Sequence, residues 1–238
     1  MFGPRNRPAT TPSTDHAGPM ELEVTDRTRL RRKAERGRFD WATVSAILDE
    51  GFVCHLGFLA GGAPTVVPTS YGRVGHDLYL HGAAANHALR TAAQSLDVSV
   101  AVTLVDGIVL ARPAFHHSLN YRSVIVFGTA RKVDDPDEKR RALLSIVDHV
   151  VPGRSEATRP PTDSEVRSTL VLRVPLSQAS AKVRDGGPVE EPEDLELPFW
   201  GGEIPLRLAA GTPVADGQGD DHAEVPTPTH AAQYRRPG

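Results

Sequence analysis

The sequence predicts a mainly β protein in which an antiparallel sheet curls or closes, with a few helices at its periphery. Three observations predict this fold class. Six or seven segments show the alternating or β-branched pattern of strands, and most of them follow one another through short turns. Strands also do not alternate with helices in the βαβ manner of a parallel sheet. Succession by hairpins therefore favours antiparallel pairing and closure.

Composition indicates one folded domain with irregular ends. The chain has 238 residues, a formal net charge of −3 and 39% hydrophobic residues. Residues 1–25 and 209–238 are rich in small residues and proline and lack apolar periodicity. We therefore expect disordered tails on either side of a folded domain that spans 26–208.

Charge and cysteine content exclude several classes of protein. The near-neutral charge argues against a nucleic-acid binder, and no apolar run approaches the ~20 residues of a membrane-spanning helix. Cys54 is the single cysteine, so no intramolecular disulfide can form. With no signal-like N-terminus, these features lead us to expect a cytoplasmic protein without a membrane partner.

The first helix and hairpin have clear boundaries. Asp40 is a good N-cap, apolar residues then recur on one helical face, and Gly51 ends the helix. A strand follows over 52–59, the Gly-Gly pair at 61–62 forms a hairpin turn, and 64–71 is the returning strand.

The middle of the chain continues with strands and turns. We expect short strands at 77–81 and 98–104, with a helix at 86–94 between them. The dipeptide Asp-Gly at 106–107 is a turn signal, after which the strand pattern resumes. The longest β-rich run covers 121–133.

A second helix begins at Asp135. Asp135 caps it, Pro136 occupies the first helical position, and Glu138 completes a capping box. The segment 169–176 is a last strong strand, and a loop-rich stretch follows over 188–206.

Common catalytic motifs are missing from the sequence. There is no Gly-x-Gly-x-x-Gly after a strand, no phosphate-binding loop, no Gly-x-Ser-x-Gly and no His-Glu-x-x-His. Dinucleotide-binding, nucleoside-triphosphate, hydrolase and zinc-protease interpretations therefore lack their signatures. Three other segments carry residues suited to binding a ligand.

The segment 81–87 reads His-Gly-Ala-Ala-Ala-Asn-His, a strand end followed by small residues and a helix start. Small residues let backbone N–H groups approach an anion, and a helix N-terminus favours one. The alternative is an ordinary strand-to-helix turn.

The segment 118–128 places Arg122 and Ser123 at the start of a very apolar strand. Adjacent strand residues face opposite sides, so one can contact a ligand while the other holds a neighbouring element. Arginine suits phosphate because its planar fork is permanently charged. The alternative is an arginine at the barrel rim that pairs with a carboxylate.

The segment 198–206 places Trp200 in a stretch rich in proline and glycine. A tryptophan there could stack on a planar ligand or cover a pocket. The alternative is a loop anchor that fills a gap in the core.

In this order, the segments resemble the FMN-binding split-barrel superfamily, in its pyridoxamine 5'-phosphate oxidase-like, flavin-nucleotide-binding branch, which is related to the nitroimidazole-resistance reductases. The resemblance covers about 27–207, and its most distinctive parts are Asn-Tyr-Arg-Ser-Val at 120–124 and Trp-Gly-Gly-Glu-Ile-Pro at 200–205. It implies a six-stranded antiparallel split β-barrel, a homodimer with FMN at the dimer interface, and an oxidoreductase that transfers electrons between the flavin and a small-molecule substrate or electron acceptor.

By position, the resemblance also implies which residues contact FMN. The segment 68–71 would lie along the isoalloxazine edge, 81–87 would wrap the ribityl phosphate, and Trp200 would approach the flavin late in the chain. The implied set is Pro68, Thr69, Ser70, Tyr71, His81, Gly82, Ala84, Ala85, Asn86, His87, Asn120, Arg122, Ser123, Lys182 and Trp200. No metal is implied. No residue stands out as an obligatory acid or base, and the best proton donors are His116, His117 and Tyr121.

One departure from the family bears on the substrate. True pyridoxamine-phosphate oxidases carry Arg-x-x-Leu-Leu-Lys on a strand and an Arg-His pair near the C-terminus, and neither 66–73 nor 206–208 reproduces these patterns. We therefore do not expect the vitamin substrate. Three alternatives stay open: a non-catalytic flavin carrier or sensor, a deazaflavin protein, and a haem or metal protein that uses His55, His81, His87, His116 and His117.

Overall fold

The computed structural model describes residues 21–83, 97–216 and 226–234. Within these residues ten strands form one sheet in the order β1-β9-β6-β5-β2-β3-β4-β8-β7, with β10 added to β5. Every strand pairing is antiparallel. The predicted antiparallel β architecture is confirmed.

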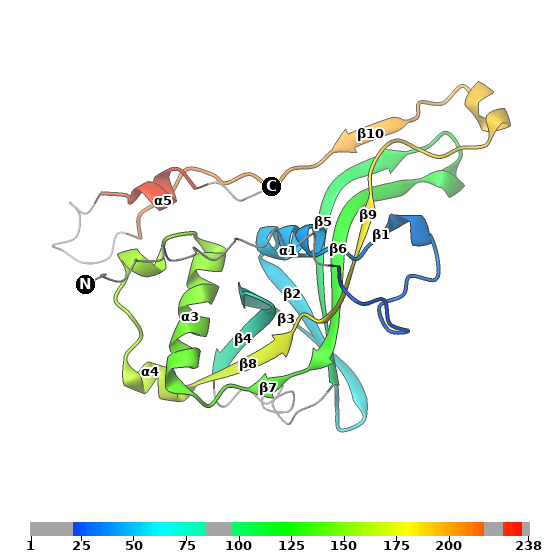
Figure 1. The fold of residues 1–238 in the computed structure, drawn as a ribbon. Helices are drawn as coiled ribbons and strands as arrows, with labels where there is room; N and C mark the ends of the chain where they lie inside the picture. Colours follow the sequence, from blue (N-terminus) through cyan, green and yellow to red (C-terminus); the bar gives the residue numbers. More distant parts are fainter. Residues whose placement is uncertain (1–20, 84–96, 217–225, 235–238) are drawn as a thin grey trace, which may run out of the picture.

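Seven strands contribute buried side chains to the main core and curl around it (Figure 1). Their bounds are β2 (Val53–Ala60), β3 (Ala63–Val74), β4 (Asp77–Ala83), β5 (Asp97–Leu110), β6 (Ser118–Thr129), β8 (Thr169–Pro175) and β9 (Gln178–Arg184). β6 and β8 approach each other at Gly128, where an added Cβ would lie 3.2 Å from Val174 Cγ1. No ladder joins β6 and β8 among the described residues, which is the split in the barrel.

Shorter strands and helices surround this barrel. The added strands are β1 (Gly37–Arg38), β7 (Arg131–Lys132) and β10 (Gly202–Pro205). The helices are α1 (Trp41–Glu50), α3 (Pro136–Val150), α4 (Asp163–Ser168) and α5 (Thr229–Ala232), with short 3-10 turns at Ala34–Arg36, Ala114–His116, Ser155–Ala157 and Pro192–Glu196. No described helix is long and apolar enough to cross a membrane.

The core forms because strand residues alternate in direction. In β2, Cys54, Leu56 and Phe58 are buried whereas Val53 and His55 are exposed. α1 packs against this core with one apolar face, and its boundaries are as predicted: the Asp40 carboxylate accepts a hydrogen bond from Thr43 N at 2.8 Å, and Gly51 follows the last turn.

The helix α3 covers the other side of β3 and β4. Gly72 makes this close packing possible, because an added Cβ would lie 2.8 Å from Ile146 N and 2.6 Å from Ser145 Oγ. The Asp135 cap and Pro136 at the helix start are confirmed. The Glu138 side chain, however, does not return to the cap, because it accepts a hydrogen bond from the Tyr79 hydroxyl at 3.0 Å.

The end of β5 after Val105 and the start of β6 before Arg122 project from the barrel as an arm, together with β10 (Figure 1). We define the arm as residues 106–121 and 184–206. The turn predicted at 106–107 is wrong, since β5 continues to Leu110. β6 pairs with β5 both before and after Asp106, since Tyr121 stands opposite Val105 and the adjacent Asn120 stands opposite Gly107. Asp106 is therefore an extra residue on β5 and forms a β-bulge.

The ends of the chain depart from the expected domain limits. Glu21 bridges to Asp40, before the predicted domain start. In the tail expected to be disordered, α5 forms, and the Tyr234 hydroxyl donates to Val150 O at 2.8 Å. Figure 1 shows the chain returning from β10 past α1 to this contact with α3. The helix predicted at 86–94 lies outside the described residues.

Candidate functional site

A cleft of about 930 Å³ lies where the arm leaves the barrel. Its walls come from the end of α1, the start of β2, the bulged region of β5 and β6, and the segment 205–208 that follows β10. Leu206 N donates to Asp106 O at 2.9 Å, which fastens that segment over the bulge. The cleft thus joins three parts of the sequence that are far apart.

Arg122 lies in this cleft between two carboxylates. Its Nε and Nη2 donate to the two oxygens of Asp106 at 2.9 and 2.8 Å. Nη2 also donates to Glu50 Oε1 at 2.8 Å, and Nη1 donates to Glu50 Oε2. The hydrogen bonds that the guanidinium donates to Asp106 and Glu50 raise its pKa above its already high value. The bulge at Asp106 turns its carboxylate toward Arg122 and so builds this pair.

The outer face of the sheet forms a second surface next to the cleft. His55 of β2 stands opposite Pro68 of β3 and Ala101 of β5. Further along the same face, Ser123 of β6 stands opposite Lys182 of β9, and its Oγ donates to Lys182 O at 3.4 Å. Exposed apolar residues on this face include Val53, Leu59, Val66 and Ile125.

A separate cavity of about 300 Å³ lies between β4, α3 and α4. Strand alternation sends Leu78 and Leu80 into the main core, and Tyr79 and His81 toward α3. The cavity wall opposite His81 is mostly apolar and comes from α3, with Leu143, Leu144, Ile146 and Val147. His81 Nδ1 is buried and has no hydrogen-bond partner among the described residues. Burial lowers the pKa of the imidazole, so the ring is neutral at neutral pH.

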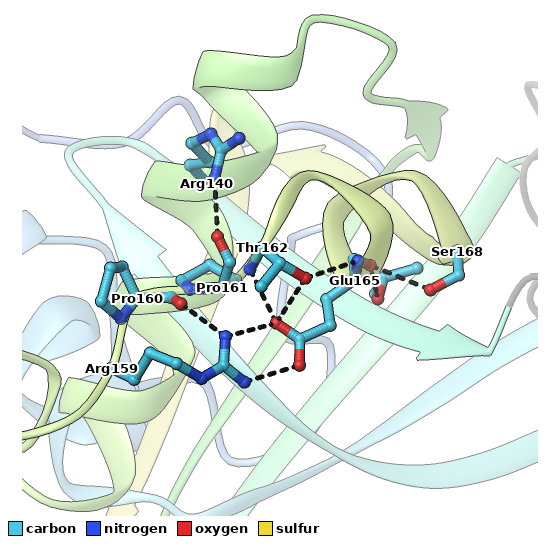
Figure 2. A network of polar contacts seen from close by, with 8 residues as sticks. Arg140, Arg159, Pro160, Pro161, Thr162, Glu165 and Ser168 are labelled. Atoms are coloured by element: carbon cyan, nitrogen blue, oxygen red, sulfur yellow. Dashed lines mark hydrogen bonds and ion pairs between the residues drawn. The ribbon is translucent and has the colours of Figure 1, made fainter.

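The rim of this cavity is a polar network, shown in Figure 2. Arg159 donates to the two oxygens of Glu165 at 3.0 and 2.7 Å, and Thr162 and Glu165 form the capping box that starts α4. Hydrogen bonds from Arg159 and Thr162 lower the pKa of Glu165 to about 2. Arg140 Nη1 donates to Pro161 O at 2.7 Å, which ties this rim to α3.

Comparison with known proteins identifies the family. A family model described as Pyridoxamine 5'-phosphate oxidase matches residues 40–183. The chain belongs to the pyridoxamine 5'-phosphate oxidase family. No curated protein matches the sequence.

Two solved structures are similar over most of the chain. The flavocytochrome Anf3 from Azotobacter vinelandii is 35% identical, with 89% of this chain and 97% of that chain covered and a TM-score of 0.82. The FAD and heme binding protein from Mycobacterium smegmatis is 31% identical, with 82% of this chain and 95% of that chain covered and a TM-score of 0.77. A protein assigned to 5-nitroimidazole antibiotic resistance, from Bacteroides thetaiotaomicron VPI-5482, is 24% identical, with 62% and 86% covered and a TM-score of 0.53, and shares the fold.

Several residues expected to contact a flavin also make contacts within the protein. Tyr71 is fully buried, and its hydroxyl donates to Leu48 O at 2.5 Å. Thr69 is paired with the buried Cys54 and so belongs to the core-facing side of β3. Asn120 is buried in the arm, where its side-chain oxygen accepts a hydrogen bond from Arg184. Arg122 forms ion pairs with two carboxylates, which is the alternative stated for it from the sequence, an arginine that pairs with a carboxylate.

Other expected site residues lie on surfaces of the barrel. Pro68 and Ser70 lie on β3, on the outer face of the sheet. Ser123 of β6 and Lys182 of β9 stand opposite each other on the same face. Lys182 Nζ also donates to Arg32 O at 3.3 Å. Gly82 pairs with Leu170 beside the His81 cavity. Ala84, Ala85, Asn86 and His87 lie outside the described residues.

The remaining candidates lie on the arm and do not line the cleft. His116 packs its ring edge-to-face on Phe115, with centroids 5.5 Å apart, and His117 Nδ1 lies 3.3 Å from Pro113 O. Trp200 has 64% of its surface exposed and packs on Gly202. Tyr121 stands opposite Val105 beside the bulge.

Sequence reasoning missed the carboxylates that define the cleft. Glu50 lies 72 residues before Arg122, and no local pattern links them. Glu190 was missed for the same reason: it accepts hydrogen bonds from the backbone N and, at 2.6 Å, from Nη1 of Arg112, and so fastens the segment after β9 to the arm. The Asp-Gly dipeptide was the one available signal, since it marks a bulge as well as a turn.

Proposed function

We propose that this protein is an oxidoreductase that binds a flavin and passes electrons between that flavin and a small molecule. One observation carries the proposal. Two structures that are more than 30% identical over more than 80% of the chain are described as a flavocytochrome and as an FAD and heme binding protein. The chemistry belongs to the flavin, and the protein supplies binding, orientation and exclusion of competing reactions.

The cleft at the base of the arm is the flavin site that we propose. Its volume of about 930 Å³ is near the upper end of the roughly 300–1,000 Å³ of ligand pockets, which suits a dinucleotide better than a mononucleotide. The volume of the cleft favours FAD over the FMN predicted from the sequence, and so does the FAD named for the similar structure from Mycobacterium smegmatis. Arg207 adds a cation at the cleft, and the described residues offer it no ion-pair partner.

We also propose that the outer sheet face is covered by a second copy of the chain, as the family resemblance implies. Val66 is 64% exposed, Val53 47% and Ile125 43%, and all three lie on strands of one sheet. Burying such a face removes apolar surface from water. Sedimentation equilibrium checks this proposal: a dimer is expected, and a monomer at micromolar concentration contradicts it.

The experiment for the flavin proposal begins with the absorbance spectrum of the purified protein. The sample is then heated, and the released molecule is identified by mass, which separates FAD, FMN and deazaflavin. The matched pair Arg207→Glu and Arg31→Glu changes one exposed arginine at the cleft and one exposed arginine that does not line it. We expect weaker FAD binding for the first variant only. A colourless protein that ignores added FAD and FMN contradicts the proposal.

Turnover separates an oxidoreductase from a flavin carrier or sensor. We expect bound flavin to be reduced by a nicotinamide donor and reoxidised by a small acceptor. A flavin that stays oxidised with every donor tested supports the carrier interpretation.

Haem is a second redox group that we propose for this protein. Of the two similar structures above 30% identity, one is described as a flavocytochrome and the other as an FAD and heme binding protein.

A further inference from the structure

Residues 27–38, which precede α1, form a strongly basic segment. This basic segment contains seven arginine or lysine residues and one glutamate, a net charge of +6 in a chain whose net charge is −3. Arg27 forms an ion pair with Asp97 at 2.6 Å. The other six basic side chains form no ion pair with a described residue.

The basic segment is held at the edge of the outer sheet face. Its strand β1 pairs with β9, so that Gly37 stands opposite Lys182. Lys182 Nζ donates to Arg32 O at 3.3 Å, and a Cβ added to Gly37 would lie 3.3 Å from Leu30 Cδ1. The segment is therefore anchored to β9 on the face that carries Lys182, and like charges fixed so close together repel one another unless anions lie nearby.

Residues 185–203 of the arm carry the opposite charge. This acidic segment contains seven aspartate or glutamate residues and no lysine, arginine or histidine. Glu190 pairs with Arg112, and no other carboxylate of the segment forms an ion pair with a described residue. Glu191 and Glu193 are exposed.

Large apolar side chains are exposed among these carboxylates. Leu195 is 57% exposed, Phe199 61% and Trp200 64%. Exposed apolar groups of this size that gather on one part of a protein mark a surface for a partner. Arginine side chains stack on aromatic rings as well as pairing with carboxylates, so a surface rich in arginine complements the acidic segment.

The two segments do not pair within one chain. No ion pair joins them in the part of the chain that the structure describes. Figure 1 shows the acidic segment at the end of the arm and the basic segment beside β1 and β9.

A second copy of the chain supplies both missing partners at once. In a two-fold symmetric dimer each contact between two different surfaces occurs twice, so both basic segments and both acidic segments are neutralised. A nucleic acid or an anionic lipid surface would complement the basic segment alone and would be repelled by the acidic one.

We propose that the acidic segment of each arm docks on the basic segment of a second copy. This proposal rests on the dimer in the proposed function, in which the outer sheet faces meet. β5 extends five residues beyond Val105, roughly 17 Å. The strand β1 lies three strand spacings from β5, roughly 14 Å across the sheet. The arm is therefore long enough to pass the edge of its own sheet and reach the flank of a partner.

The test reverses the charge of one segment at a time in the full-length protein. The basic-segment variant combines Arg29→Glu, Arg32→Glu, Lys33→Glu and Arg36→Glu. The acidic-segment variant combines Glu191→Lys, Glu193→Lys, Asp194→Lys and Glu196→Lys. The control variant combines Arg131→Glu, Arg141→Glu and Arg167→Glu, which are exposed arginines on β7, α3 and α4.

Sedimentation equilibrium measures the dimer dissociation constant of each protein. We expect the constant to rise at least about tenfold in each segment variant, since like charges then face each other across the interface. The control variant should dimerise as the wild type does.

Mixing the two segment variants is the decisive measurement. In a heterodimer the intact acidic segment of one variant meets the intact basic segment of the other, and the two altered segments also carry opposite charges. Native mass spectrometry should therefore show heterodimers in excess of either homodimer, which also shows that both variants are folded. A mixture that associates no better than the separate variants overturns the proposal.

The arm contact and the dimer itself can fail separately. A wild-type monomer contradicts the proposed dimer and the docking of the arm together. A wild-type dimer whose dissociation constant is unchanged in both segment variants overturns the docking of the arm alone and leaves the outer sheet face as the interface.

Discussion

The barrel and the arm are stabilised by different interactions. The barrel surrounds an almost fully buried apolar core in which Leu56, Leu80 and Val100 have no exposed surface. The arm instead depends on strand pairing and on charged side chains, Arg184 with Asn120 and Arg112 with Glu190. Its tip leaves Phe115 92% exposed. The comparison indicates that apolar burial stabilises the barrel, whereas strand pairing and polar contacts hold the arm.

Leu80→Ala should have the largest effect on stability. Leu80 is fully buried, so its truncation should lower the free energy of unfolding by about 2–5 kcal/mol. Leu119→Ala on the arm removes the same atoms from a side chain that is 46% exposed, and should cost less than about 1 kcal/mol. Urea unfolding measures both. Equal losses in the two variants would break the distinction between barrel and arm.

Arg122→Ala tests the junction between the two regions. It leaves Glu50 and Asp106 without their shared partner in a partly buried place, and should cost about 1–3 kcal/mol. Arg122→Lys keeps the charge but cannot donate in a fork to both carboxylates, so it should recover part of the loss. Chemical unfolding gives the stabilities. A stability unchanged from wild type would show that the ion pairs do not hold the junction.

Asp40→Ala tests the cap of the helix that closes one end of the barrel. Loss of the hydrogen bond to Thr43 N should cost about 1 kcal/mol, whereas Asp40→Asn should retain most of it. The hydrogen bonds from Thr43 lower the pKa of Asp40 below its usual 3.8. Its contribution is therefore present at neutral pH and is lost as the pH falls below about 3.8 through the folded-state pKa. Thermal unfolding at pH 7 and pH 2.5 should show a smaller difference between Asp40→Ala and wild type at the lower pH.

Phe115→Ser should have the smallest effect on stability. The ring is almost fully exposed at the tip of the arm, so its loss should change the free energy of unfolding by less than about 0.5 kcal/mol. A loss comparable to that of Leu80→Ala, measured on the dimer, would mean that the tip is buried by a partner.

Much of the fold was predictable because its signals are local. The cap at Asp40, the hairpin turn at 61–62 and the start of α3 all appear where the sequence predicts them. β9 and α4 were not predicted, since Gln178–Arg184 has small residues in place of β-branched ones and α4 has only six residues. The turn expected at 106–107 failed because an Asp-Gly pair serves a bulge equally well when the partner strand continues.

The candidate site was less predictable because it depends on contacts between distant segments. Arg122 was recognised, but its partners were not, and they give it a structural role beside the proposed flavin. His81 was expected at a flavin phosphate. The structure places it in a cavity lined by α3, which follows it by more than 50 residues, and no local pattern signals that contact.

By itself, the sequence determined the antiparallel β class, the family, both ends of α1 and the start of α3, because turns, caps and alternation act between neighbours in the chain. Only the tertiary structure decided which charges neutralise one another, which polar atoms are buried, and where cavities remain. Burial and electrostatic pairing depend on all the elements that surround a side chain, so the cleft at Arg122 and the unpaired nitrogen of His81 emerge only after β2–β9 and α3 have packed.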